Sequence, residues 1–138
     1  MKLFTTGDCG AIMNAAPAAI ATNMKIWVGV WAVDDGKFAN EKGNLEAALK
    51  QYQSAWIAGV NVGSESLYRK EIDPWLLAQR IYDVKGMVQQ AYGAKDVPVG
   101  SADTWTSWVD PANEQVVDAC DVCALITYHY YYYRHYPL

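Results

Sequence analysis

The sequence predicts an α/β protein with parallel strands and flanking helices. Runs of β-branched and aromatic residues, typical of buried strands, alternate with helical patterns at intervals of roughly thirty residues. Strands connected through helices cross over in a right-handed sense and form a parallel sheet that the helices cover. The predicted strands lie near residues 2–6, 25–31, 57–62, 97–100 and 121–128.

Helix signals lie between these strands. Asp73 before Pro74 and Asp110 before Pro111 combine an N-cap with proline at the first helical position. Pro17 lies inside an Ala-rich helical pattern and predicts a kink or a late start there. The predicted helices cover residues 11–22, 44–54, 73–93 and 110–119, whereas the polar segments 32–43 and 101–108 are expected to be loops.

Length and charge limit the class of protein. The 138 residues, 52% of them hydrophobic, suit one domain with a core of its own, spanning residues 1–138. A formal net charge of -4 without a run of Lys or Arg argues against nucleic acid or an anionic membrane as a partner. No apolar run reaches the ~18 to 20 residues that a membrane span needs, and no signal-peptide pattern precedes Lys2.

The three cysteines are Cys9, Cys120 and Cys123. Cys120 and Cys123 have CxxC spacing, but a second pair of metal ligands is missing, and the motif precedes a strand where redox motifs usually open a helix. We therefore expect no metal and no cofactor. In a secreted protein, a bridge from Cys9 to one of the other two is expected, which leaves one free thiol.

Glu65 is the main candidate for chemistry. The buried strand 57–62 ends at Gly63, and parallel α/β folds place their active sites at the carboxyl ends of strands. Tyr68 and Arg69 follow Glu65, and the chain has six Trp and ten Tyr, whose faces suit stacking on sugar rings. A carboxyl group in this setting suits proton transfer on a sugar. A solvated loop glutamate beside a structural arginine is the alternative.

Two architectures fit the alternation of strands and helices. One is a flavodoxin-like open sheet that binds a nucleotide, and the other is part of an eight-fold barrel. The loop after the first strand, Gly7-Asp8-Cys9-Gly10, matches neither phosphate-binding fingerprint. The predicted loops at the carboxyl ends carry carboxylates and aromatic residues instead.

Several motifs in order resemble the fungal branch of glycoside hydrolase family seventeen, cell-wall endo-1,3-β-glucosidases and glucanosyltransferases. These are Asp8-Cys9, Lys25-Ile26-Trp27-Val28-Gly29-Val30-Trp31, the segment from Gly59 to Arg69, and Val97-Pro98-Val99-Gly100-Ser101-Ala102-Asp103-Thr104-Trp105. The resemblance covers essentially the whole chain. It implies a (β/α)8 TIM barrel of which the chain holds about strands two to six, an incomplete catalytic domain. It also implies a retaining glycosidase acting on 1,3-β-glucan, from a secreted parent protein at the cell wall.

The resemblance also implies roles for individual residues. Glu65 matches the general acid/base at the end of the fourth barrel strand, and Ser64 stands where clan relatives usually have Asn. Tyr68, Asp103, Trp105 and Tyr131 are the further glucan-binding candidates, although the chain lacks the family's Pro near Tyr131.

The family's nucleophile, a Glu after the seventh strand, is expected beyond Leu138, so the sequence predicts a fragment. A binding-only role, with glucan held around Trp31, Trp105 and Trp108, is the alternative, and self-association through open barrel edges is a further expectation.

Overall fold

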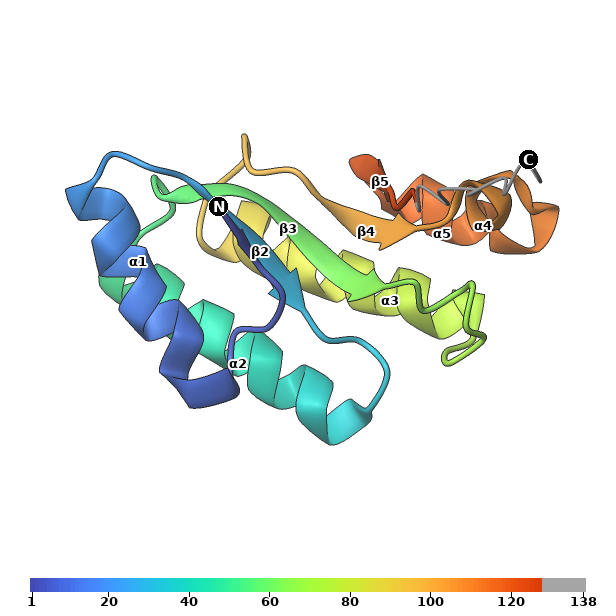
Figure 1. Cartoon of the computed structure of the whole chain (residues 1–138), viewed down its shortest axis with the longest axis horizontal. Helices are drawn as coiled ribbons and strands as arrows, with labels where there is room; N and C mark the ends of the chain where they lie inside the picture. The colour runs from blue at the N-terminus through green and yellow to red at the C-terminus, as the bar shows by residue number, and fades with distance from the viewer. Residues whose placement is uncertain (128–138) are drawn as a thin grey trace, which may run out of the picture.

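A five-stranded parallel sheet organises the protein, and the computed structural model describes residues 1–127 of it (Figure 1). The strands follow one another across the sheet in chain order, and every neighbouring pair is parallel. The predicted parallel α/β sheet is therefore confirmed. The strands are β1 (Lys2–Leu3), β2 (Ile26–Val30), β3 (Ile57–Ser64), β4 (Val99–Asp103) and β5 (Val122–Leu125).

Helices connect successive strands, and α1, α2 and α3 lie along one face of the sheet (Figure 1). Asp73 accepts a hydrogen bond from the Trp75 N–H at 2.8 Å and caps α3, as the sequence predicts. Pro17 lies inside α1, which starts at Ala11 without the predicted delay. The elements are η1 (Asp8–Gly10), α1 (Ala11–Ala21), α2 (Asp35–Tyr52), α3 (Pro74–Lys85), the π-helical η2 (Gly86–Ala91), α4 (Trp105–Val109), η3 (Pro111–Asn113) and α5 (Glu114–Ala119).

Two predicted loops are wrong. Helix α2 begins at Asp35 rather than at residue 44, because the Asp34 carboxylate accepts the Lys37 N–H at 2.8 Å and caps the helix there. The segment 101–108 is also not a loop, since β4 continues to Asp103 and Thr104 then caps α4 by accepting from the Ser107 N–H.

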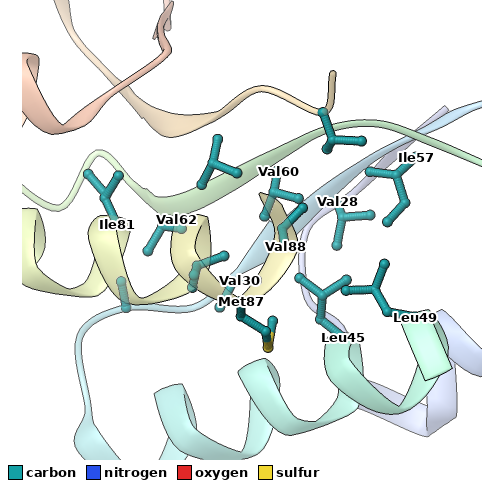
Figure 2. Close-up of a cluster of buried hydrophobic side chains, with 14 of the residues drawn as sticks. Val28, Val30, Leu45, Leu49, Ile57, Val60, Val62, Ile81, Met87 and Val88 are labelled. Atoms are coloured by element: carbon teal, nitrogen blue, oxygen red, sulfur yellow. The ribbon is translucent and has the colours of Figure 1, made fainter. Parts of the chain in front are cut away.

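The core lies between the sheet and the helices. Val28, Val60 and Val99 are fully buried and stand in register on three adjacent strands, so their side chains form one row toward the helices. Figure 2 shows Leu45, Leu49, Ile81, Met87 and Val88 reaching the same layer from the helical side. Burying each such side chain contributes about 1.5–3 kcal/mol, which fixes the sheet on its helices.

The opposite face of the sheet carries different residues. Trp27, Gly29, Gly59 and Asn61 occupy the alternate positions of β2 and β3. The Trp27 indole lies directly on Gly59, where an added Cβ would overlap the ring. Because all strands are parallel, their carboxyl ends lie together at one end of the sheet.

Among the described residues, no helix is long and apolar enough to cross a membrane.

Candidate functional site

Glu65 lies directly after β3, in a sharp turn of the backbone. Gly63 and Glu65 have φ angles of +77° and +55°, the left-handed region that favours glycine. The Glu65 N–H donates to the Ala102 carbonyl in β4 at 2.8 Å, which ties the turn to the neighbouring strand. A non-glycine residue held at positive φ is costly, and such residues concentrate at functional sites.

The Glu65 carboxylate is nearly buried. The residue is 6% exposed, and its Oε2 atom lies 2.7 Å from Nη2 of Arg69, which is four residues further along the chain. The Arg69 side chain is 44% exposed and also lies 3.8 Å from Glu71. The Arg69 guanidinium therefore holds the carboxylate in a defined orientation. This geometry contradicts the alternative of a solvated loop glutamate.

A pocket of about 430 Å³ opens beside Glu65 at the carboxyl ends of the first three strands. Within the described part of the chain, Glu65 is the single carboxylate in its lining. The polar lining also offers Lys2, Asn61 and Ser64, and the pocket is large enough for a sugar unit. The full lining is Lys2, Phe4, Gly29, Val30, Trp31, Asn61, Gly63, Ser64, Glu65, Arg69 and Ile126.

Aromatic side chains contribute to the pocket wall. Trp31 follows β2, and Lys37 places its Nζ 4.7 Å from the centre of one face of the Trp31 ring. Phe4 follows β1 and is largely exposed. Flat apolar rings beside polar groups are the combination that binds a sugar through its C–H face and its hydroxyls.

Asn61 is a pocket residue that the sequence predictions missed. It is buried within β3, and its Nδ2 donates to the Gly63 carbonyl. Strand periodicity gives a signal for it, since Asn61 is the polar residue inside an otherwise apolar run. Ser64, which was predicted, lines the same pocket, so both residues present polar groups beside Glu65.

Asp103 lies behind the pocket wall rather than in it. It is fully buried, and its carboxylate accepts backbone N–H groups of Leu67 at 2.9 Å, Tyr68 at 3.2 Å and Thr104 at 2.8 Å. A carboxylate engaged in this way has its oxygens directed at the backbone. In the structure the Asp103 side chain holds the loop that follows Glu65, and its predicted contact with glucan stays a prediction.

Tyr68 and Trp105 are exposed on two neighbouring loops. They are 60% and 63% exposed, and the Asp103 carboxylate joins their loops through Tyr68 and Thr104. Neither residue lines the pocket itself. Trp108 is instead structural, since its Nε1 donates to the Ala124 carbonyl of β5 at 3.1 Å.

Tyr131, the remaining predicted site residue, lies outside the described residues 1–127.

A second buried carboxylate holds the loop after β1. Glu41 of α2 accepts the Thr6 N–H at 2.7 Å and the Gly7 N–H at 3.3 Å, and it also accepts from the Thr5 hydroxyl. Burial alone would raise the pKa of Glu41, but the hydrogen bonds from Thr5, Thr6 and Gly7 together lower it below its usual value. The Glu41 carboxylate thereby stabilises the loop next to Phe4.

The cysteines do not support the predicted bridge. All three thiols are free, and Cys9 follows the edge strand β1 whereas Cys120 and Cys123 flank the start of β5 at the other edge. Four strand spacings of about 4.8 Å separate these edges, far beyond the reach of a disulfide. Burial, together with the adjacent Cys123, raises the pKa of Cys120 to about 12, which disfavours a reactive thiolate. The described residues contain no cluster of three or more potential metal ligands.

Comparison with known proteins gives consistent matches. Residues 1–135 match the family described as the BtgE/BtgC glycoside hydrolase domain. A glucan 1,3-beta-glucosidase of Schizosaccharomyces pombe is 39% identical over 123 residues, covering 88% of this chain and 38% of the relative. A probable glucan endo-1,3-beta-glucosidase of Aspergillus fumigatus is 35% identical over 141 residues, covering 91% and 31%.

Solved structures give the same result. The glycoside hydrolase family 17 beta-1,3-glucanosyltransferase from Rhizomucor miehei superposes with a TM-score of 0.75 at 31% identity, covering 88% of this chain and 43% of that one. Its active-site mutant, in complex with laminaritriose, superposes equally well. These neighbours are TIM-barrel enzymes, so the five-stranded sheet corresponds to an arc of such a barrel. The chain spans less than half the length of these relatives.

Proposed function

The chain belongs to the BtgE/BtgC glycoside hydrolase domain family, in the fungal branch of glycoside hydrolase family 17, and from this premise we propose that it carries the acid/base part of a site acting on 1,3-β-glucan. The observation that carries the proposal is Glu65, nearly buried at the carboxyl end of β3 beside a sugar-sized pocket. The laminaritriose complex of the Rhizomucor miehei relative supports glucan as the ligand class.

Glu65 would act as the general acid and base. In retaining hydrolysis one carboxyl group protonates the leaving glycosidic oxygen and later takes a proton from water or an acceptor sugar. Arg69 orients that carboxyl group through its 2.7 Å contact. Trp31, Ser64 and Asn61 would hold the sugar in the pocket, while Tyr68 and Trp105 would contact glucan units outside it.

Retention requires a second carboxylate about 5 to 5.5 Å from the first. Among the described residues that line the pocket, Glu65 is the single carboxylate. A second carboxylate must therefore come from outside the described residues. This observation also favours a second candidate function, in which the 138-residue chain binds glucan without cleaving it. We also propose that the parent protein is located at the cell wall. Fractionation of cells that produce a tagged form would test this location.

Two measurements separate these functions. Laminaritriose titrated into the chain by calorimetry should bind, and Trp31→Ala should weaken the binding, with no reducing sugar released from laminarin. No detectable binding would contradict the glucan assignment. A hybrid in which this chain replaces the matching 43% of the Rhizomucor miehei enzyme then supplies the rest of the barrel.

In that hybrid, Glu65→Gln should reduce turnover of laminarin by about 10²–10⁴-fold, since general acid catalysis typically contributes that much. Cleavage of an aryl glycoside with an activated leaving group should be partly retained, because such a group needs little protonation. Glu114→Gln, at an exposed glutamate outside the pocket lining, is the matched control and should change turnover of neither substrate. Equal loss on both substrates would refute the acid/base role, and a hybrid that binds laminaritriose without turnover would favour the binding function.

Self-association through the sheet edges is part of the proposal. In the described part of the chain, β1 and β5 each pair with one strand, and Leu125 of β5 is 56% exposed. Unpaired strand edges with apolar side chains favour pairing with another chain. Sedimentation should find association that Leu125→Lys reduces and that Val117→Lys on α5 does not. A monomeric wild-type chain would contradict this part.

A further inference from the structure

We propose that Asp103 is the positioning residue for Glu65: its buried carboxylate fixes the turn that aims the acid/base carboxyl group into the pocket. The inference rests on the proposed function for the role of Glu65. It rests on separate contacts for the role of Asp103, whose carboxylate accepts the backbone N–H groups of Leu67, Tyr68 and Thr104, three residues outside the pocket lining. Asp103 is therefore assigned a role through another residue.

The contacts hold the turn on both sides of Glu65. At the start of the turn, the Glu65 N–H donates to the Ala102 carbonyl at 2.8 Å. After it, the N–H groups of Leu67 and Tyr68 donate to the Asp103 carboxylate at 2.9 and 3.2 Å. Ser66, which lies between Glu65 and Leu67, accepts the Ser64 N–H through its hydroxyl at 3.3 Å. Every residue of the segment 64–68 thus has a side chain or backbone group tied down.

The Glu65 backbone conformation explains why such a clamp is needed. A φ of +55° is unfavourable for a residue with a side chain, so the turn persists only where its surroundings determine it. Hydrogen bonds to a buried charged acceptor are roughly twice as strong as those between neutral groups. Asp103 supplies that acceptor, and its third bond, from the Thr104 N–H at 2.8 Å, fixes the carboxylate on its own strand end.

A carboxylate is required for this arrangement, because both of its oxygens accept. Oδ2 receives the Leu67 N–H, whereas Oδ1 receives those of Tyr68 and Thr104. In Asp103→Asn one oxygen becomes an NH2 group that faces an N–H donor. Whichever way the amide is turned, at least one backbone N–H loses its acceptor in a buried place. The turn, and with it the Glu65 side chain, should then sample other conformations.

The test uses amide hydrogen exchange and carboxyl ¹³C chemical shifts of the full chain. In Asp103→Asn the exchange rate of at least one of Leu67 and Tyr68 should rise about tenfold or more, while Val28 and Val60 in the central strands keep theirs. The carboxyl ¹³C resonance of Glu65 should move, which a purely structural loss elsewhere would not cause. Both readouts are independent of glucan binding and turnover, so failure of the proposed function would leave them intact.

Asp110→Asn is the matched control. Asp110 caps η3 by accepting the Ala112 N–H at 2.9 Å, and Asn is an equally good N-cap, so this identical substitution should leave the Glu65 resonance unchanged. An unchanged Glu65 resonance in Asp103→Asn would overturn the proposal. A uniform rise in exchange across Val28, Val60 and Leu67 would overturn it as well, because it would make Asp103 a general stabiliser rather than a positioning residue.

Discussion

Replacing Glu41 with Gln tests how the pocket loops are held. Glu41 Oε1 accepts the Gly7 N–H at 3.3 Å and the Thr5 hydroxyl, while Oε2 accepts the Thr6 N–H at 2.7 Å. Gln keeps the shape but turns one oxygen into an NH2 group that faces a backbone donor. At least one hydrogen bond to a charged acceptor is lost and the others weaken. Since each such bond contributes about 1.5–3 kcal/mol, the free energy of unfolding should fall by about 2–4 kcal/mol.

The pH dependence gives this prediction its signature. The pKa of Glu41 is lowered from its usual 4.5, so its contribution to stability is fully present above that value and is lost as the pH falls through the folded-state pKa. As the pH falls below 4.5 and through the lowered folded-state pKa, the wild-type carboxyl group becomes protonated and resembles Gln. The difference in unfolding free energy between wild type and Glu41→Gln should therefore shrink there.

Urea unfolding followed by circular dichroism at neutral and acidic pH measures both effects. Glu46→Gln on the same helix is the matched control, because Glu46 is partly exposed, pairs with Lys50 and accepts the Tyr92 hydroxyl at 2.8 Å, a bond that the Gln amide oxygen can keep; it should change stability much less than Glu41→Gln. A domain has only about 5–15 kcal/mol of stability, so the predicted loss is readily detected. The reasoning would be refuted by a loss below about 0.5 kcal/mol at neutral pH, or by a difference that stays constant with pH.

Two further predictions concern the thiols and the face of the sheet that carries Trp27 and Gly59. Under native conditions at about pH 8, an alkylating reagent should modify the exposed Cys9 and Cys123 and spare Cys120, since its raised pKa keeps the thiol protonated; mass spectrometry that finds a peptide linked through Cys9 would contradict the strand order. Gly59→Ala should lower the free energy of unfolding by about 1–3 kcal/mol, because the new Cβ displaces the Trp27 indole. An unchanged free energy of unfolding in urea would contradict that contact.

The strands were easier to predict than the helices. Runs of branched residues located β2 and β3 within about two residues, since burial on both faces leaves little room for polar residues. Helix α2 was predicted to start too late because its buried stripe, which includes Phe38 and Leu45, contains the polar Glu41. Gly43 weakens the helical pattern further. Sequence periodicity cannot distinguish a buried, fully bonded glutamate from a surface one.

The location of Glu65 was predictable and its surroundings less so. A strand that ends on glycine predicts where Glu65 lies, whereas its acid/base role is implied by the family resemblance and stays a prediction. The contacts of the Asp103 side chain could not be predicted, because its partners are the backbone N–H groups of Leu67 and Tyr68, which lie about 35 residues earlier. A sequence pattern identifies a polar side chain near a strand end. Only the structure shows whether that side chain faces a ligand or the backbone.

Three buried charged side chains hold the loops that follow β1, β2 and β3 around the pocket. Glu41 of α2 holds the loop after β1, and Asp103 of β4 holds the loop after β3. Arg80 of α3 does the same for the loop after β2, since it donates to the Ala32 carbonyl and pairs with Asp35 while its guanidinium lies 4.8 Å from the Phe38 ring.

Each of these loops is therefore fixed by the strand–helix unit that follows it rather than by its own. A buried charge is costly to leave unpaired, so loosening one unit should release the loop of the unit before it. The turn at Glu65 accordingly depends on β4, and the Trp31 loop depends on α3. The geometry at the carboxyl ends of the strands is then cooperative along the chain, and a substitution that frays β4 should disturb the turn at Glu65 even where it leaves β3 intact.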